Sequence, residues 1–147
     1  MYKHILLPTD GSEVAHKGIT EGLNLAKAVG ARVTFVIASE PLPVFADATG
    51  LAPLAVDMAQ YFEAQEESAA RALSGAKAAA DKLGVQAETV HVSRAQPADT
   101  ILDIAKSRGC DLIVMASHGR RGVGRLLLGS QASDVVTRSP VPVLVVK

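Results

Sequence analysis

The stretch Leu112-Ile113-Val114-Met115-Ala116-Ser117-His118-Gly119 joins a strongly apolar run to a short group of small and polar residues. An apolar run that ends in this way is typical of a buried strand leading into a loop. Nine residues separate Gly119 from the pair Gly129-Ser130, and a helix-like segment, 131–138, follows that pair. Free N–H groups at a helix start attract anions, and glycines let phosphate oxygens approach the backbone. The stretch therefore predicts a phosphate cradle.

The first strand-like segment ends in a similar way. Residues 4–9 form an apolar run that Asp10 closes, and Ser12 then caps a helix that stops at Gly30. In a parallel sheet, ligands bind at the carboxyl ends of strands, where the winding direction reverses. We therefore expect the ends of strands 4–9 and 111–116 to form one crevice.

Strand-like and helix-like segments alternate along the whole chain, which we expect to be a single domain, 1–147. The expected strands are 4–9, 32–38, 85–92, 111–116 and 141–147, and the expected helices are 13–29, 57–83, 97–108 and 131–138. Met58, Tyr61 and Phe62 open the apolar side of the second helix, and residues 40–56 are expected to be a long loop. The alternation predicts an α/β fold of three layers, with a doubly wound, Rossmann-like parallel sheet of order 3-2-1-4-5.

Composition and charge exclude several classes of protein. The chain is 48% apolar and 3% aromatic, so its core must be aliphatic, and its net charge of zero argues against nucleic-acid binding. Residues 106–147 carry seven Lys or Arg and two Asp, a net charge of +5, and the phosphate cradle lies in this part. No apolar run approaches the roughly 18 residues of a membrane span. The single cysteine, Cys110, fits a reducing compartment, so we expect a cytoplasmic protein.

Taken together, these residues resemble the universal stress protein family over the whole chain. The resemblance rests on Lys3-His-Ile-Leu-Leu-Pro-Thr-Asp-Gly-Ser12, on 111–119, on 126–130 and on 140–146. The nucleotide-binding branch of that family carries the pattern Gly, two residues, Gly, nine residues, Gly-Ser/Thr. Gly119, Gly129 and Ser130 match this pattern, whereas Ala116 stands where it has its first glycine. A side chain there costs about 1 kcal/mol if the position needs a positive φ, and nothing otherwise.

The resemblance implies an adenine nucleotide alpha hydrolase-like fold and a site for ATP, with ADP or AMP as alternatives. In similar proteins the residues matching Asp10 and Ala38 border the ribose and adenine, and those matching 115–120 and 129–132 wrap the ribose and phosphates. The expected nucleotide contacts are Pro8, Thr9, Asp10, Ala38, Met115, Ala116, His118, Gly119, Arg120, Gly129, Ser130, Gln131 and Ala132. Asp10 either accepts from the ribose or reaches Mg²⁺ on the phosphates, or is a turn carboxylate beside a helix start.

Other residues near the cradle also have two interpretations. Arg120, Arg121 and Arg125 either form a solvated loop face or close over the phosphates as a lid. His118 is either a solvated loop residue or a ligand contact, and Ser130 could cap the last helix. Residues 124–130 lack the lysine of a P-loop, and the glycines do not form a dinucleotide fingerprint. No metal-ligand spacing relates His4, His16 and His91 to each other or to Cys110, so no transition-metal site is expected.

The last strand-like segment predicts a second copy of the chain as a partner. Pro142 cannot donate to a strand ladder, which favours an edge position. The residues after it, 143–146, are apolar, and an exposed apolar edge is normally covered. We therefore expect a homodimer through Val141–Lys147, and the family resemblance implies the same.

Three functions are compatible with these patterns. The favoured one is a nucleotide-binding regulatory protein of the stress response, which acts on unidentified protein partners. The second is a slow ATPase or an autophosphorylating enzyme, but no general base or arginine finger is recognisable. The third is a nucleotide-free module that functions as a dimer.

Overall fold

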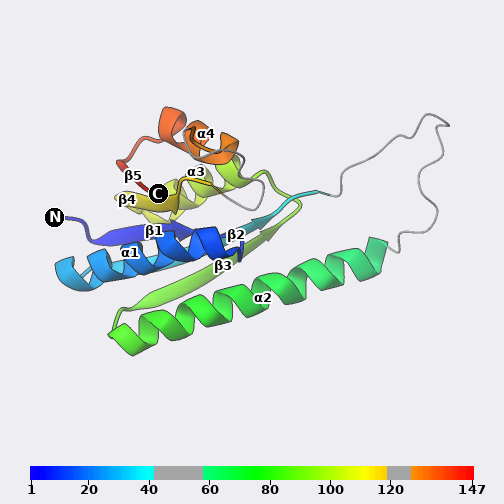
Figure 1. The fold of residues 1–147 in the computed structure, drawn as a ribbon, viewed down its shortest axis with the longest axis horizontal. Coiled ribbons are helices and arrows are strands. Elements are labelled where there is room, and N and C mark those ends of the chain that lie inside the picture. Colours follow the sequence, from blue (N-terminus) through cyan, green and yellow to red (C-terminus); the bar gives the residue numbers. More distant parts are fainter. Residues whose placement is uncertain (42–57, 119–126) are drawn as a thin grey trace.

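A computed structural model of the chain describes residues 1–41, 58–118 and 127–147, in which strands and helices alternate (Figure 1). The strands are β1 (His4–Pro8), β2 (Arg32–Ser39), β3 (Ala87–Ser93), β4 (Leu112–Ala116) and β5 (Val143–Val146). The helices are α1 (Glu13–Val29), α2 (Met58–Leu83), α3 (Pro97–Arg108) and α4 (Ser130–Arg138). The expected elements form, and their ends differ from the expected ones by two residues or fewer.

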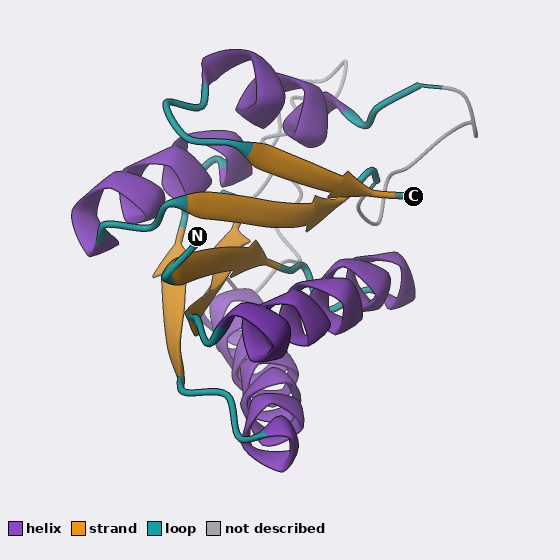
Figure 2. Cartoon of the chain, turned by 90° about the vertical axis from the view of Figure 1, so that its left-hand side faces the viewer, coloured by secondary structure: helices purple, strands orange, loops and turns teal. Residues whose placement is uncertain are grey.

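The five strands form one parallel sheet in the order β3-β2-β1-β4-β5. Helices α1 and α2 pack on one face of this sheet, and α3 and α4 pack on the other (Figure 2). The chain winds outward from β1 to β3 and then returns to β4, so the winding direction reverses between β1 and β4. The three-layer, doubly wound fold is therefore confirmed.

Each face of the sheet carries an aliphatic core. Because side chains alternate along a strand, Ile5 and Leu7 face α1 and α2, whereas Leu6 faces α3 and α4. Phe35, which is fully buried, is the largest side chain in the first core. In the described part of the chain, no helix is long and apolar enough to cross a membrane.

Helix α2 is longer than the sheet that it covers (Figure 1). Its 26 residues span about 39 Å, whereas the eight residues of β2 span about 26 Å. Its first buried residue is Ala69, and Met58 is 46% exposed, so the expectation that Met58 faces the core is wrong. Helical periodicity identifies the apolar face of a helix but does not show where its partner sheet ends. Tyr61 and Phe62 are half-buried and pack edge to face, with ring centroids 5.7 Å apart.

Both ends of α1 form as the sequence predicts. The Ser12 hydroxyl accepts a hydrogen bond from the N–H of Ala15 at 3.2 Å, which caps the first turn. Gly30 ends the helix with a φ of 70°, a left-handed conformation that favours glycine. The start of α1 is thereby fixed directly after the end of β1.

Candidate functional site at the carboxyl edge of the sheet

The carboxyl ends of β1 and β4 lie next to each other in the middle of the sheet. The ladder joins Ile5 to Leu112 and Leu6 to Ile113. The pairing of β1 with β4 stops there in the described strands. Strand β1 nevertheless continues to Pro8, and β4 continues to Ala116. Pro8 has no N–H to donate. The strands therefore part at the edge where the winding reverses, which is the usual ligand position in such folds.

The turn after β1 holds the carboxylate of Asp10 beside the start of α1. The N–H of Thr9 donates to the carbonyl of Val36 at 2.9 Å, which ties the turn to β2. Asp10 Oδ1 accepts from the N–H of Ser12 at 2.9 Å. This bond supports the turn interpretation of Asp10, and its contact with a ligand stays a prediction. Ala38 is half-buried and lies two residues beyond Val36, at the same edge.

The end of β4 is bonded to two other elements. The N–H of Ser117 donates to the carbonyl of Val146 at 2.8 Å, and the N–H of Gly129 donates to the carbonyl of Ser117 at 2.8 Å. Met115 and Ala116 are buried in the preceding strand. The second bond brings the start of α4 against the end of β4, as the predicted cradle requires.

Gly129 lets the backbone approach closely at this contact, where a side chain would have little space. A Cβ atom on Gly129 would lie 3.1 Å from the carbonyl oxygen of Ser117 and 3.4 Å from the Cα of His118. Its φ of −58° is open to any residue, so the requirement is close approach and not an unusual conformation. Ala116 needs no glycine either, because Arg94 is the one non-glycine residue with a positive φ among those the structure describes.

Helix α4 begins without a side-chain cap. Gly129 is its N-cap, so Ser130 is the first helical residue and not the cap. The first backbone bond of the helix runs from the N–H of Ser133 to the carbonyl of Gly129. The N–H groups of residues 130–132 therefore precede the helical ladder, and such groups attract anions. In the described part of the chain, no hydrogen bond engages these three donors.

The side chain of Gln131 has a structural partner. Its Oε1 accepts from the N–H of Ala98 at 3.0 Å and thereby caps the start of α3. Gln96, the N-cap residue of α3, makes no such bond itself. The backbone of Gln131, and not its amide side chain, is therefore directed to the candidate site. The neighbouring Ala132 is buried against the second core.

His118 is half-buried and lies directly after the end of β4, next to Gly129. Its Nδ1 lies 3.0 Å from the Ser117 hydroxyl, whereas its Nε2 is buried without a partner among the described residues. A buried polar atom without a partner is costly, so Nε2 marks a place where a further group would be stabilised. The predicted contacts Gly119 and Arg120 lie outside the described residues, as do the other arginines of the predicted lid.

Two contacts that sequence reasoning did not foresee contribute to the site. Ser117 lies in the predicted stretch 115–120, but the bond by which its carbonyl positions α4 was not expected. Gly18 lets α1 approach the end of β4, since a Cβ on Gly18 would lie 2.9 Å from the nitrogen of Ala116. No local sequence signal distinguishes Gly18 from another helical glycine.

Known proteins resemble this chain over its whole length. A sequence model described as the Universal stress protein family matches residues 1–147. A universal stress protein of Thermus aquaticus is 36% identical over 147 residues and is matched over 100% of both chains. Another, from Methanocaldococcus jannaschii, is 35% identical over 147 residues, which cover 100% of this chain and 83% of the relative.

Solved structures share the fold. A Methanocaldococcus jannaschii protein, solved as a test case of structural genomics, has a TM-score of 0.80 at 28% identity and covers 100% of this chain and 96% of its own. A universal stress protein in complex with cAMP has a TM-score of 0.73 at 24% identity, over 99% of this chain and 97% of its own. A universal stress protein from Archaeoglobus fulgidus in complex with dAMP has a TM-score of 0.65 at 23% identity, over 99% of this chain and 98% of its own.

Proposed function

This chain belongs to the universal stress protein family, and we propose that it binds an adenine nucleotide, with ATP as the expected form, at the carboxyl edge of its sheet. The observation that carries the proposal is the bond between Gly129 and Ser117, which sets the uncapped start of α4 against the end of β4. Relatives with the same fold were solved with cAMP and with dAMP. A nucleotide of this class therefore suits the fold.

In this proposal the phosphates lie at the start of α4, where the N–H groups of residues 130–132 would donate to them. Asp10 and Ala38 border the ribose and adenine from the ends of β1 and β2, and Asp10 supplies a carboxylate oxygen of the kind that Mg²⁺ on the phosphates accepts. The described backbone from Met115 to His118 would contribute to the cradle, and the predicted contacts Gly119 and Arg120 lie outside the described residues. His118 Nε2 supports this placement, because a phosphate or ribose oxygen would give the orphaned atom a partner.

The first experiment asks whether Gly129 shapes a nucleotide site. Nucleotide released from the denatured, freshly purified protein is identified, and ATP with Mg²⁺ is then titrated into the stripped protein by calorimetry. Gly129→Val adds branched volume beside the Ser117 carbonyl, so ATP affinity should fall at least about tenfold, which corresponds to 1.4 kcal/mol. Gly75→Val is the matched control, because a Cβ on the exposed Gly75 meets no atom within 4 Å. Unaltered ATP affinity in Gly129→Val would show that the cradle is assigned wrongly.

We propose a regulatory role in the cytoplasm, in which nucleotide binding changes how the protein interacts with its partners. The cytoplasmic location is supported by Cys110, a buried free thiol of the kind that reducing compartments preserve. Incubation with ATP and Mg²⁺ should return the nucleotide intact over hours. Steady release of ADP and phosphate would favour the slow ATPase instead, and transfer of labelled phosphate to the protein would favour autophosphorylation.

We also propose that the protein forms a homodimer through β5 and the residues around it, Val141–Lys147. Strand β5 is an edge strand, Leu144 is 44% exposed on it, and Val136 of the neighbouring α4 is 42% exposed. Exposed apolar side chains on an unpaired edge favour pairing with a second copy. Leu144→Lys should give a monomer in analytical ultracentrifugation. Val14→Lys on α1, where Val14 is 41% exposed, should leave the dimer intact, and a dimeric Leu144→Lys protein would contradict the interface.

A further inference from the structure

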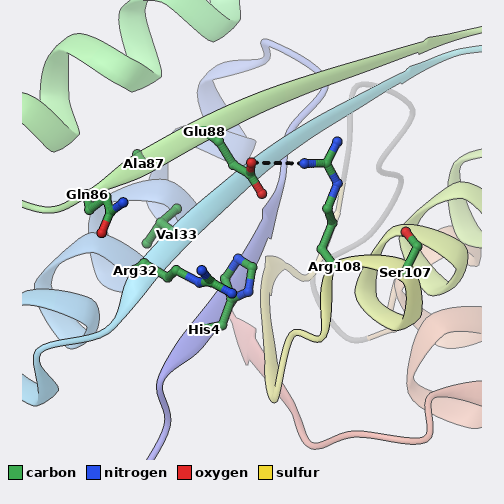
Figure 3. A pocket seen from close by; sticks show the side chains of 8 residues that line it. All are labelled: His4, Arg32, Val33, Gln86, Ala87, Glu88, Ser107 and Arg108. Carbon is green, nitrogen blue, oxygen red and sulfur yellow. Dashed lines mark hydrogen bonds and ion pairs between the residues drawn. The ribbon is translucent and has the colours of Figure 1, made fainter.

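A polar cavity of about 320 Å³ lies at the amino edge of the sheet, at the opposite ends of the strands from the proposed nucleotide site (Figure 3). It is lined by residues at the starts of β1, β2 and β3 and at the end of α3, among them His4, Arg32, Glu88 and Arg108. Its volume is in the range of small-molecule sites. The proposed nucleotide site uses none of these residues.

A chain of hydrogen bonds runs along this cavity from the buried His4 and Thr34 to the exposed Glu88. The hydroxyl of Thr34, which is fully buried, donates to Glu88 Oε1 at 2.7 Å. A hydroxyl has one proton, so the Thr34 oxygen must accept from His4 Nε2, which lies 2.7 Å away. In its neutral form His4 therefore carries its proton on Nε2, and burial together with the nearby Arg32 guanidinium lowers the pKa of His4 and so favours that form. These two hydrogen bonds hold the Glu88 carboxylate in place.

The side chains that line the cavity carry a net positive charge. Glu88 Oε2 accepts from Arg108 at 2.9 Å, and Figure 3 shows this ion pair across the cavity. Arg32 forms no ion pair within the described ranges 1–41, 58–118 and 127–147. The nearby Asp111 carboxylate keeps its negative charge but lies outside the lining, where it accepts from the N–H groups of Lys3 and His4 at 2.8 and 3.1 Å. The two guanidinium groups and one carboxylate in the lining sum to a charge of +1.

We infer that this cavity is a binding site for a small monocarboxylate, held by the Arg32 guanidinium. A carboxylate takes two parallel hydrogen bonds from a guanidinium, and a single negative charge balances the lining without displacing Glu88 from Arg108. The side chains of Val33 and Ala87 pack in the first core, so only their backbone borders the cavity, and the Gln86 amide provides a further donor to the ligand. A phosphate dianion would instead leave a net negative charge beside Glu88.

The site is tested by NMR titration of the ¹⁵N-labelled full chain with sodium butyrate at constant pH and ionic strength. Butyramide, the uncharged isostere, and inorganic phosphate are titrated in parallel. Butyrate should shift the amide signals of Val33, Gln86 and Ala87 in a saturable way, and should leave those of Ser130 and Gln131 in place. Shifts that do not saturate, an equal response to butyramide, or tighter binding of phosphate would each overturn the assignment.

Charge-removing variants locate the bound carboxylate. Arg32→Gln should weaken butyrate binding about tenfold, because it removes charged hydrogen bonds to the ligand. Arg71→Gln is the matched control on α2, where Arg71 is exposed and pairs at 3.9 Å with Glu67. Butyrate affinity that is unchanged in Arg32→Gln, or reduced equally in Arg71→Gln, would refute the role of Arg32. Neither variant lies at the proposed nucleotide site, so ATP titration separates the two proposals.

Discussion

Replacing Gly18 with alanine tests the contact through which α1 supports the end of β4. A Cβ on Gly18 would lie 2.9 Å from the nitrogen of Ala116 and 3.3 Å from the carbonyl carbon of Met115. Both neighbours are backbone atoms, which cannot rotate away as a side chain can. Gly75 provides the matched control, because it also lies inside a helix but is exposed, and a Cβ there meets nothing within 4 Å.

Helix propensity and overpacking together predict opposite changes in the free energy of unfolding for the two variants. Alanine favours a helix over glycine by about 1 kcal/mol at either position. Overpacking of a close contact costs about 1–3 kcal/mol, and Gly18 belongs at the upper end because α1 or β4 must shift as a whole. Gly75→Ala should therefore stabilise the protein by about 1 kcal/mol, and Gly18→Ala should destabilise it by about 1–2 kcal/mol. Urea unfolding followed by circular dichroism measures both.

A ligand readout shows whether the contact also matters at the candidate site. Displacement of Ala116 by Gly18→Ala should weaken ATP binding, whereas Gly75→Ala should leave it unchanged. If the two variants unfold at the same urea concentration, α1 does not approach β4 as closely as 2.9 Å implies, and the reasoning fails. If Gly18→Ala is destabilised but binds ATP normally, the contact is structural and does not shape the site.

Two further predictions concern buried titratable groups. Burial lowers the pKa of His4 below its usual 6.5, so the unfolded chain takes up the proton first, and the free energy of unfolding should fall as the pH drops through about 6.5. His4→Gln should flatten this dependence in urea unfolding between pH 7.5 and 5.5, and an unchanged slope would exclude His4 as its source. Burial raises the pKa of the Cys110 thiol to about 11, so the native protein should resist iodoacetamide at pH 8 and react once unfolded. Rapid labelling of the native protein would contradict this burial.

Much of the fold is predictable because its signals are local or follow from general rules of topology. Ser12 and Gly30 mark the ends of α1 in the sequence itself, and both act as expected. The alternation of strands and helices predicts a parallel sheet, and right-handed crossovers leave few strand orders. The polar strand ends after β1 and β4 then indicate which strands are neighbours. The edge position of β5 follows from Pro142 in the same way.

The detailed geometry of the two candidate sites depends on contacts between residues far apart in the sequence. The spacing from Gly119 to Gly129 predicts a cradle, but it cannot show that Gly129 is the N-cap of α4 or that it contacts Ser117. The chain of bonds from His4 through Thr34 to Glu88 links three strands, and none of these residues stands in a motif with another. Such arrangements depend on strand register, which composition and periodicity do not specify.

The two edges of the sheet differ in the chemistry by which they hold an anion. In this fold each crossover helix begins at the carboxyl edge and ends at the amino edge, so free helix N–H groups gather at the first edge and helix carbonyls at the second. An anion at the carboxyl edge can therefore bind backbone, and the decisive property is space, as at Gly129. An anion at the amino edge needs a side-chain cation, which is the role inferred for Arg32. Added volume should therefore disrupt the first site, and lost charge the second.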